Sequence, residues 1–164
     1  MPVNEPLFVT LIMESPTQII LVSRTAELKI RFARVLDVTN KKIALSSIQY
    51  PHVELEKRHR MKRLVKDSYA VGEMLTALIT CDEVKENTIM NEINSSNASL
   101  PFRCLDMIQL QTYRERTLLE IESPQYHDFS ASSLFGLTLS LCDLNGDKIS
   151  FDGGGYVMVK LLIK

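Results

Sequence analysis

The residues with the most evident capacity for chemistry lie near the C-terminus, in the stretch DLNGDKISFDGGG. Asp143, Asn145 and Asp147 occupy alternate positions, like the first ligands of a calcium-binding EF-hand loop. That loop needs glycine at position 6 and a bidentate glutamate at position 12, but here glycine falls at position 4 and position 12 is Gly154. The flanking residues also alternate like strands. We therefore predict a tight hairpin turn, because Asn145 and Gly146 tolerate positive φ angles.

The three consecutive glycines Gly153, Gly154 and Gly155 are a second candidate site, for phosphate. A phosphate-binding loop would continue with Gly-Lys-Ser/Thr and open a helix, and neither feature follows here. Glycine within a strand pattern more often marks a bulge or a bend. We therefore predict that these glycines bend the strand that follows the hairpin.

The histidines and cysteines suggest neither a catalytic nor a metal site. His52, His59 and His127 have no metal-ligand spacing and are interpreted as surface residues. A GxSxG nucleophile motif does not occur. The sequence thus predicts no catalytic residue, no metal ligand and no cofactor.

Three cysteines, Cys81, Cys104 and Cys142, are too few and too scattered for a disulfide framework. We expect reduced thiols in a cytosolic or nuclear setting. Arg103 could lower the pKa of the Cys104 thiol, but a lone cysteine in an apolar run is more typical of a small core residue.

A basic run between residues 54 and 67 is the remaining candidate contact site. It allows three interpretations: a solvated charged loop, a contact with a neighbouring subunit, or weakly supported phosphate contacts with nucleic acid, since aromatic residues for base stacking are absent there. Its cations are Lys57, Arg58, Arg60, Lys62, Arg63 and Lys66.

The overall composition is that of an ordinary globular domain. The chain has 164 residues, 45% of them hydrophobic and 24% charged, with a net charge of −1. This length predicts a single domain over residues 1–164. The first residues lack the features of a signal peptide, and the apolar runs are too short for a membrane span, so we expect neither secretion by a signal peptide nor a membrane span.

The segments that position these residues mostly alternate between apolar and polar side chains, which is the pattern of β-strands. Leu28, Ile30 and Phe32 alternate with cations, as expected of a half-buried strand. Two longer alternating segments, at 137–142 and 157–163, flank the predicted turn, and residues 148–151 are expected to continue the return strand. Further strands are predicted at 7–13, 17–22, 41–50, 102–110 and 116–121.

Two central segments leave the secondary structure open. Residues 69–81 fit either a buried strand or a short helix, and residues 54–67 either a short helix or a charged loop. The seven to nine strands predicted in total indicate an all-β antiparallel sandwich, with at most one short helix in the middle.

Two parts of the chain resemble a known family. The segment from Ile43 to Pro51, IALSSIQYP, preceded by Phe32 and Leu36, and the C-terminal segment with its glycine corner are similar to jelly-roll proteins of Polinton/Maverick elements, adintoviruses and virophages. Lys42 lies at or next to the position where that family usually has tryptophan. The resemblance implies a single jelly roll of about eight strands.

The same resemblance implies a function. Such proteins are pentons, minor capsid subunits that form homopentamers at icosahedral vertices and contact the major capsid protein. We therefore expect a structural protein of the virion, assembled in the host cytoplasm or nucleus. The alternatives are a non-enzymatic jelly-roll module that binds carbohydrate or protein, including one domesticated by a host, and a cupin-type enzyme, for which the histidines lie in unsuitable segments.

Overall fold

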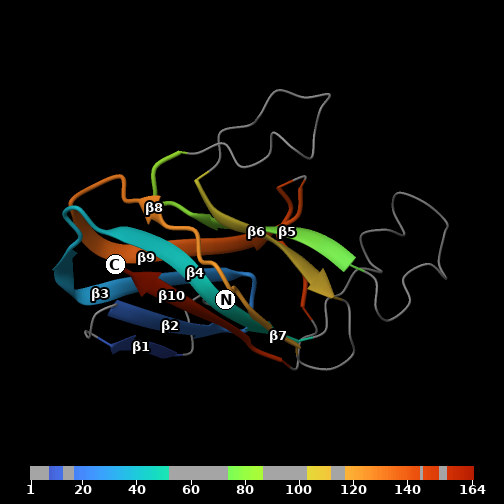
Figure 1. Ribbon diagram of the computed structural model, residues 1–164. Helices are drawn as coiled ribbons and strands as arrows, with labels where there is room; N and C mark the ends of the chain where they lie inside the picture. The colour runs from blue at the N-terminus through green and yellow to red at the C-terminus, as the bar shows by residue number, and fades with distance from the viewer. Residues whose placement is uncertain are drawn as a thin grey trace, which may run out of the picture.

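The structure is a computed structural model that describes residues 8–12, 17–51, 74–86, 103–111, 117–144, 146–151 and 155–164 (Figure 1). These residues form ten strands and no helix. The strands are β1 (Phe8–Ile12), β2 (Thr17–Ser23), β3 (Glu27–Asp37), β4 (Lys42–Tyr50), β5 (Met74–Cys81), β6 (Cys104–Gln111), β7 (Thr117–Glu120), β8 (His127–Asp128), β9 (Ser133–Cys142) and β10 (Val157–Ile163).

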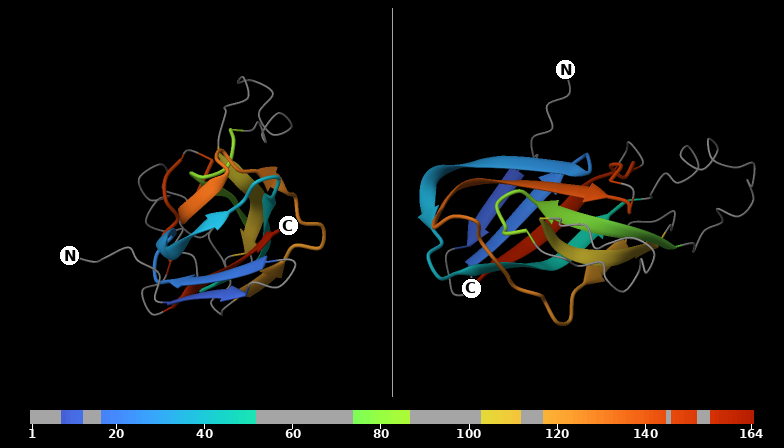
Figure 2. Two further views of the ribbon diagram at one scale, coloured as in Figure 1. Left: turned by 90° about the vertical axis from the view of Figure 1, so that its left-hand side faces the viewer. Right: turned by 90° about the horizontal axis from the view of Figure 1, so that it is seen from above.

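The strands form two antiparallel sheets that pack as a sandwich (Figure 2). One sheet has the order β1-β2-β10-β4-β7, with β8 also pairing with β4, and the other has the order β3-β9-β5-β6. Without β1 and β8, each sheet has four strands, and the chain passes between the sheets in the order of a jelly roll. The prediction of an all-β sandwich with a single jelly roll of about eight strands is confirmed.

Alternation along the strands explains which side chains form the core. Leu28, Leu137, Leu139, Leu141 and their counterparts on β10 are buried, whereas the residues between them are half-buried or exposed. Because the inward faces of both sheets are apolar, the core fills the space between the layers. A smaller buried cluster, Leu78, Cys104 and Cys142, lies on the opposite face of the second sheet.

The two ambiguous central segments have different outcomes. The segment 69–81 contains β5, so its strand interpretation is confirmed for Met74–Cys81. The segment 54–67, with its helix or loop, lies outside the described residues. The single domain over residues 1–164 stays a prediction.

All three cysteines are free and buried. Burial raises the pKa of the Cys104 thiol to about 12, so Arg103 does not activate it. Arg103 instead donates to the Asp82 and Val84 carbonyls and pairs with Glu86. Cys104 is therefore a small core residue in the second cluster.

Candidate functional site

A groove of about 820 Å³ lies on the second sheet. We call it the β3–β9 groove. It is lined by residues 29–31 of β3, residues 133–138 of β9, residues 129–131 before β9, and Glu83 in the turn after β5. Its volume lies within the range of ligand and peptide pockets.

An irregular pairing of β3 with β9 produces this groove. Arg31 pairs with Gly136, but the next pair is Leu36 with Leu134, so residues 32–35 of β3 face only Phe135. Extra residues on one strand bend it and interrupt the hydrogen-bond ladder, as in a β-bulge. Gly136 permits the close approach beside the bulge, because a Cβ atom there would lie 2.2 Å from the Ile30 carbonyl oxygen.

Two exposed apolar side chains mark the bulge. Phe135 is 64% exposed and Val35 is 52% exposed, and the register places both in the bulged part of the β3–β9 pair. Exposed apolar groups that gather on one face, rimmed by polar residues, are typical of a binding surface.

The rim of the bulge on β3 is basic. Lys29, Arg31 and Arg34 are exposed, and none forms an ion pair with any residue that the structure describes. Of the nearby carboxylates, Asp37 is engaged with Thr39, which lowers its pKa through hydrogen bonds. The groove therefore combines an apolar contact area with free positive charge.

Glu83 connects the groove wall to β9. Its Oε2 accepts the Thr138 N–H at 3.0 Å and the Cys81 thiol at 3.4 Å. The Glu83 carbonyl accepts both the N–H and the hydroxyl of Ser130, at 2.8 and 3.0 Å. Burial raises the pKa of the Glu83 carboxyl, although the Thr138 N–H partly opposes this.

The raised pKa predicts that replacing Glu83 changes the pH dependence of stability. The ordinary pKa of a glutamate carboxyl is 4.5, and the folded chain keeps Glu83 protonated above that pH. The stability that this proton contributes is therefore complete below pH 4.5 and is lost as the pH rises through the raised pKa of the folded state. A Glu83→Gln chain keeps an acceptor for Thr138 but cannot ionise. Urea unfolding should show this variant gaining stability over wild type between pH 5 and pH 7.

The two chains differ at one titratable group, so other carboxylates with raised pKa, such as Asp106, cancel in the comparison. A stability difference that stays constant from pH 4.5 to pH 7 would show that burial does not penalise the Glu83 carboxylate.

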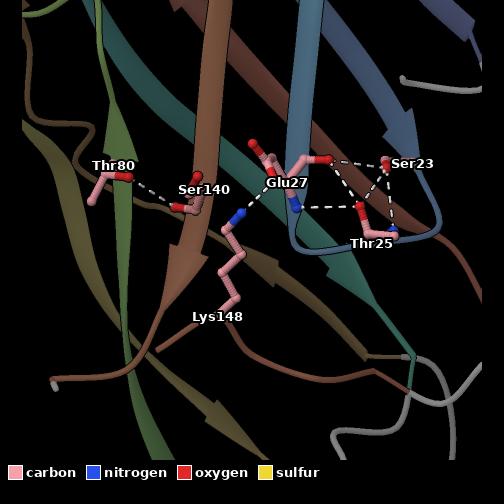
Figure 3. A network of polar contacts seen from close by, with 6 residues as sticks. All are labelled: Ser23, Thr25, Glu27, Thr80, Ser140 and Lys148. Carbon is pink, nitrogen blue, oxygen red and sulfur yellow. Dashed lines mark hydrogen bonds and ion pairs between the residues drawn. The ribbon is translucent and has the colours of Figure 1, made fainter. Parts of the chain in front are cut away.

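The opposite end of β3 is fixed by polar contacts (Figure 3). Lys148 forms an ion pair with Glu27. The Thr25 hydroxyl donates to the Glu27 carbonyl at 3.0 Å, and the Thr25 N–H donates to the Ser23 hydroxyl at 3.2 Å. These contacts tie the β2–β3 connection to the segment after β9, so β3 is anchored at one end and bulged at the other.

The predicted turn near the C-terminus is closed by hydrogen bonds that link Asp143 with Gly146 and with Asp147. Gly146 has φ 86° and donates to the Asp143 carbonyl at 3.0 Å. The Asp143 carboxylate accepts the Asp147 N–H at 3.0 Å. Asn145 lies outside the described residues. The Asp143 carboxylate thus serves the turn, and no group of three or more potential metal ligands occurs among the residues described.

The strands flanking this turn do not form the expected hairpin with each other. β9 lies in one sheet and β10 in the other, and residues 148–151 contribute isolated bridges instead of continuing β10. Only a short pairing remains, in which Ile149 donates to Leu141 at 3.0 Å. Alternation is the same for strands that pair and for strands that face each other across a core, so it could not separate these cases.

The remaining predicted site residues are only partly described. A Cβ atom on Gly155 would lie 2.2 Å from Pro51 Cβ, so this glycine allows a close approach of two segments. Gly153, Gly154 and the whole basic run lie outside the described residues. The run consists of Lys57, Arg58, Arg60, Lys62, Arg63 and Lys66.

His127 is less exposed than the sequence suggested. It is half-buried on β8, and its Nε2 lies 2.7 Å from the Leu105 carbonyl oxygen on β6. Since β8 pairs with β4, this contact links the two sheets, and His127 is structural in this arrangement. His52 and His59 lie outside the described residues.

No family model, no curated protein and no solved structure matches this chain. Among the described residues, no helix is long and apolar enough to cross a membrane.

Proposed function

We propose that this chain is a non-enzymatic structural capsid protein, a penton that assembles as a homopentamer at icosahedral vertices and contacts the major capsid protein. The observation that carries this proposal is the complete jelly-roll strand order, β2-β10-β4-β7 over β3-β9-β5-β6. Jelly rolls of eight strands are a recurrent architecture of viral capsid domains. The sequence resemblance at both ends of the chain points to the same role.

The exposed side chains also support a protein that assembles. Leu118 on β7, like Val35 and Phe135, is a large apolar residue that is more than half exposed, at 55%. All three residues lie on strands, on β3, β7 and β9. Such positions suit lateral contacts between subunits.

The oligomeric state of the purified protein tests this proposal. Native mass spectrometry should give an assembly of five copies, about five times the 18.7 kDa chain mass. Negative-stain electron microscopy should show rings with five-fold symmetry, and coexpression with a candidate major capsid protein should place the chain at particle vertices. A protein that stays monomeric at high concentration and is absent from purified particles would contradict the proposal.

The β3–β9 groove favours a second candidate, a jelly-roll module that binds a carbohydrate or protein ligand. Its volume of about 820 Å³ and the exposed Phe135 would suit a ligand that stacks on an aromatic ring. Glycan and peptide arrays should then give hits that a Phe135→Ala chain loses. Arrays without hits would remove this alternative.

A further inference from the structure

We propose that the β3–β9 groove of one copy binds the β7 edge of the next copy, and that this head-to-tail contact is the subunit interface. This inference rests on the proposed function, because it names the surfaces through which the homo-oligomer forms. It commits the groove to one occupant, a second copy of this chain.

The first argument is the character of the β7 edge. Leu118 and Glu120 are two residues apart on β7, so both side chains lie on the same outward face, and both are exposed. Glu122, just beyond the strand, is also exposed. Neither carboxylate forms an ion pair with a described residue. The β7 edge is therefore an exposed leucine accompanied by two free negative charges.

The groove has the complementary character. Phe135 lines the groove and is exposed, and the exposed Val35 lies in the bulged part of β3. Lys29 and Arg31 also line the groove, and Arg34 follows on the same strand. None of these three cations has an acidic partner among the described residues. The acidic residue of the groove, Glu83, is already hydrogen-bonded to Thr138 and Cys81. Both surfaces have an apolar contact area, but the β7 edge carries negative charges and the groove carries positive ones. Such charge complementarity favours the correct register of the two copies.

The second argument is where the two surfaces lie on the sandwich. β7 is the edge of one sheet and β3 is the edge of the other. Between the two sheets, β3 contacts β2, whereas β6 contacts β4, the neighbour of β7. The β3 edge and the β7 edge therefore lie at opposite sides of the sandwich. One copy can therefore use both surfaces at once without self-blocking. Two different patches that meet head to tail generate a ring when the rotation closes.

Charge reversal tests the contact directly. We expect Arg31→Glu alone and Glu120→Arg alone each to raise the Kd of self-association about tenfold or more in sedimentation equilibrium, because each places like charges face to face. The double variant, Arg31→Glu with Glu120→Arg, restores opposite charges across the contact. It should associate with a Kd within about threefold of wild type, as expected for a directly interacting pair.

A truncation of a groove side chain gives an independent measurement. Phe135→Ala should raise the Kd about tenfold or more, as expected for a buried aromatic anchor. Leu144→Ala is the matched control, because Leu144 is also exposed, at 42%, but lies in the turn after β9 and outside both surfaces. Circular dichroism and urea midpoints establish that each variant is folded.

The outcomes separate this inference from the proposed function. Five-fold rings that persist in all variants would overturn the interface and leave the vertex role standing. Rings of another size that the single reversals dissociate and the double variant restores would support the interface and contradict the penton role. A wild-type chain that stays monomeric, or whose groove binds an acidic peptide probe as a monomer, would overturn the interface.

Discussion

A Gly136→Ala chain is expected to have a free energy of unfolding about 2 to 4 kcal/mol lower than wild type. The added Cβ atom would lie 2.2 Å from the Ile30 carbonyl oxygen. That oxygen belongs to the backbone of β3, in the ladder where Arg31 pairs with Gly136, so it cannot rotate away. The two strands would have to separate, and urea unfolding followed by circular dichroism would measure the loss.

Gly146→Ala is the control for this prediction. Gly146 has φ 86°, and apart from its chain neighbours no atom of the described residues lies within 4 Å of an added Cβ, so only the backbone conformation is penalised there. That penalty is about 1 to 2 kcal/mol for a residue other than glycine. Equal losses in the two variants would mean that the close approach at Gly136 is relieved without opening the β3–β9 pair.

Period-two alternation made most of the strands predictable. Inward positions such as Leu28, Leu139 and Val159 had to be apolar because both sheets cover one core, and this requirement is written directly into the sequence. The strand β8 was missed because it has only two residues, too few to show any period. Its position depends on pairing with β4, which is a tertiary contact.

Strand pairing was not predictable in the same way. The two C-terminal strands, β9 and β10, flank a short turn, and a hairpin was the natural interpretation. In the structure the residues between Gly146 and β10 carry the chain from one sheet to the other. Alternation constrains the face that a strand buries but not the neighbour with which it pairs, so the jelly-roll order comes from global packing.

The groove left a faint signal in the sequence. Leu134 and Leu137 are both buried, yet they are three residues apart, so the alternation of β9 slips by one residue at Phe135 and Gly136. Such a slip indicates irregular pairing at this point, and in the structure the extra residues lie on the partner strand, β3. The raised pKa of Glu83 had no comparable signal, since it depends on burial and on contacts with residues distant in the chain.

The largest predicted loss from a core side chain is at Tyr50, the last residue of β4. Tyr50 is 1% exposed, and the centroid of its ring lies 6.4 Å from the centroid of the Phe151 ring. The hydroxyl accepts the Gln111 N–H at 2.8 Å, which joins β4 of one sheet to β6 of the other. We expect Tyr50→Ala to lower the free energy of unfolding by about 3 to 5 kcal/mol, because it removes both the ring and this inter-sheet bond.

Tyr50→Phe separates the two contributions, since it keeps the ring and removes only the hydroxyl. We expect a loss of about 1 to 2 kcal/mol, the cost of leaving the Gln111 N–H without this acceptor. Urea unfolding of the two variants and wild type gives both values in one experiment. If Tyr50→Phe were as stable as wild type, the ring alone would hold β4 against β6, and the joint between the sheets would be apolar.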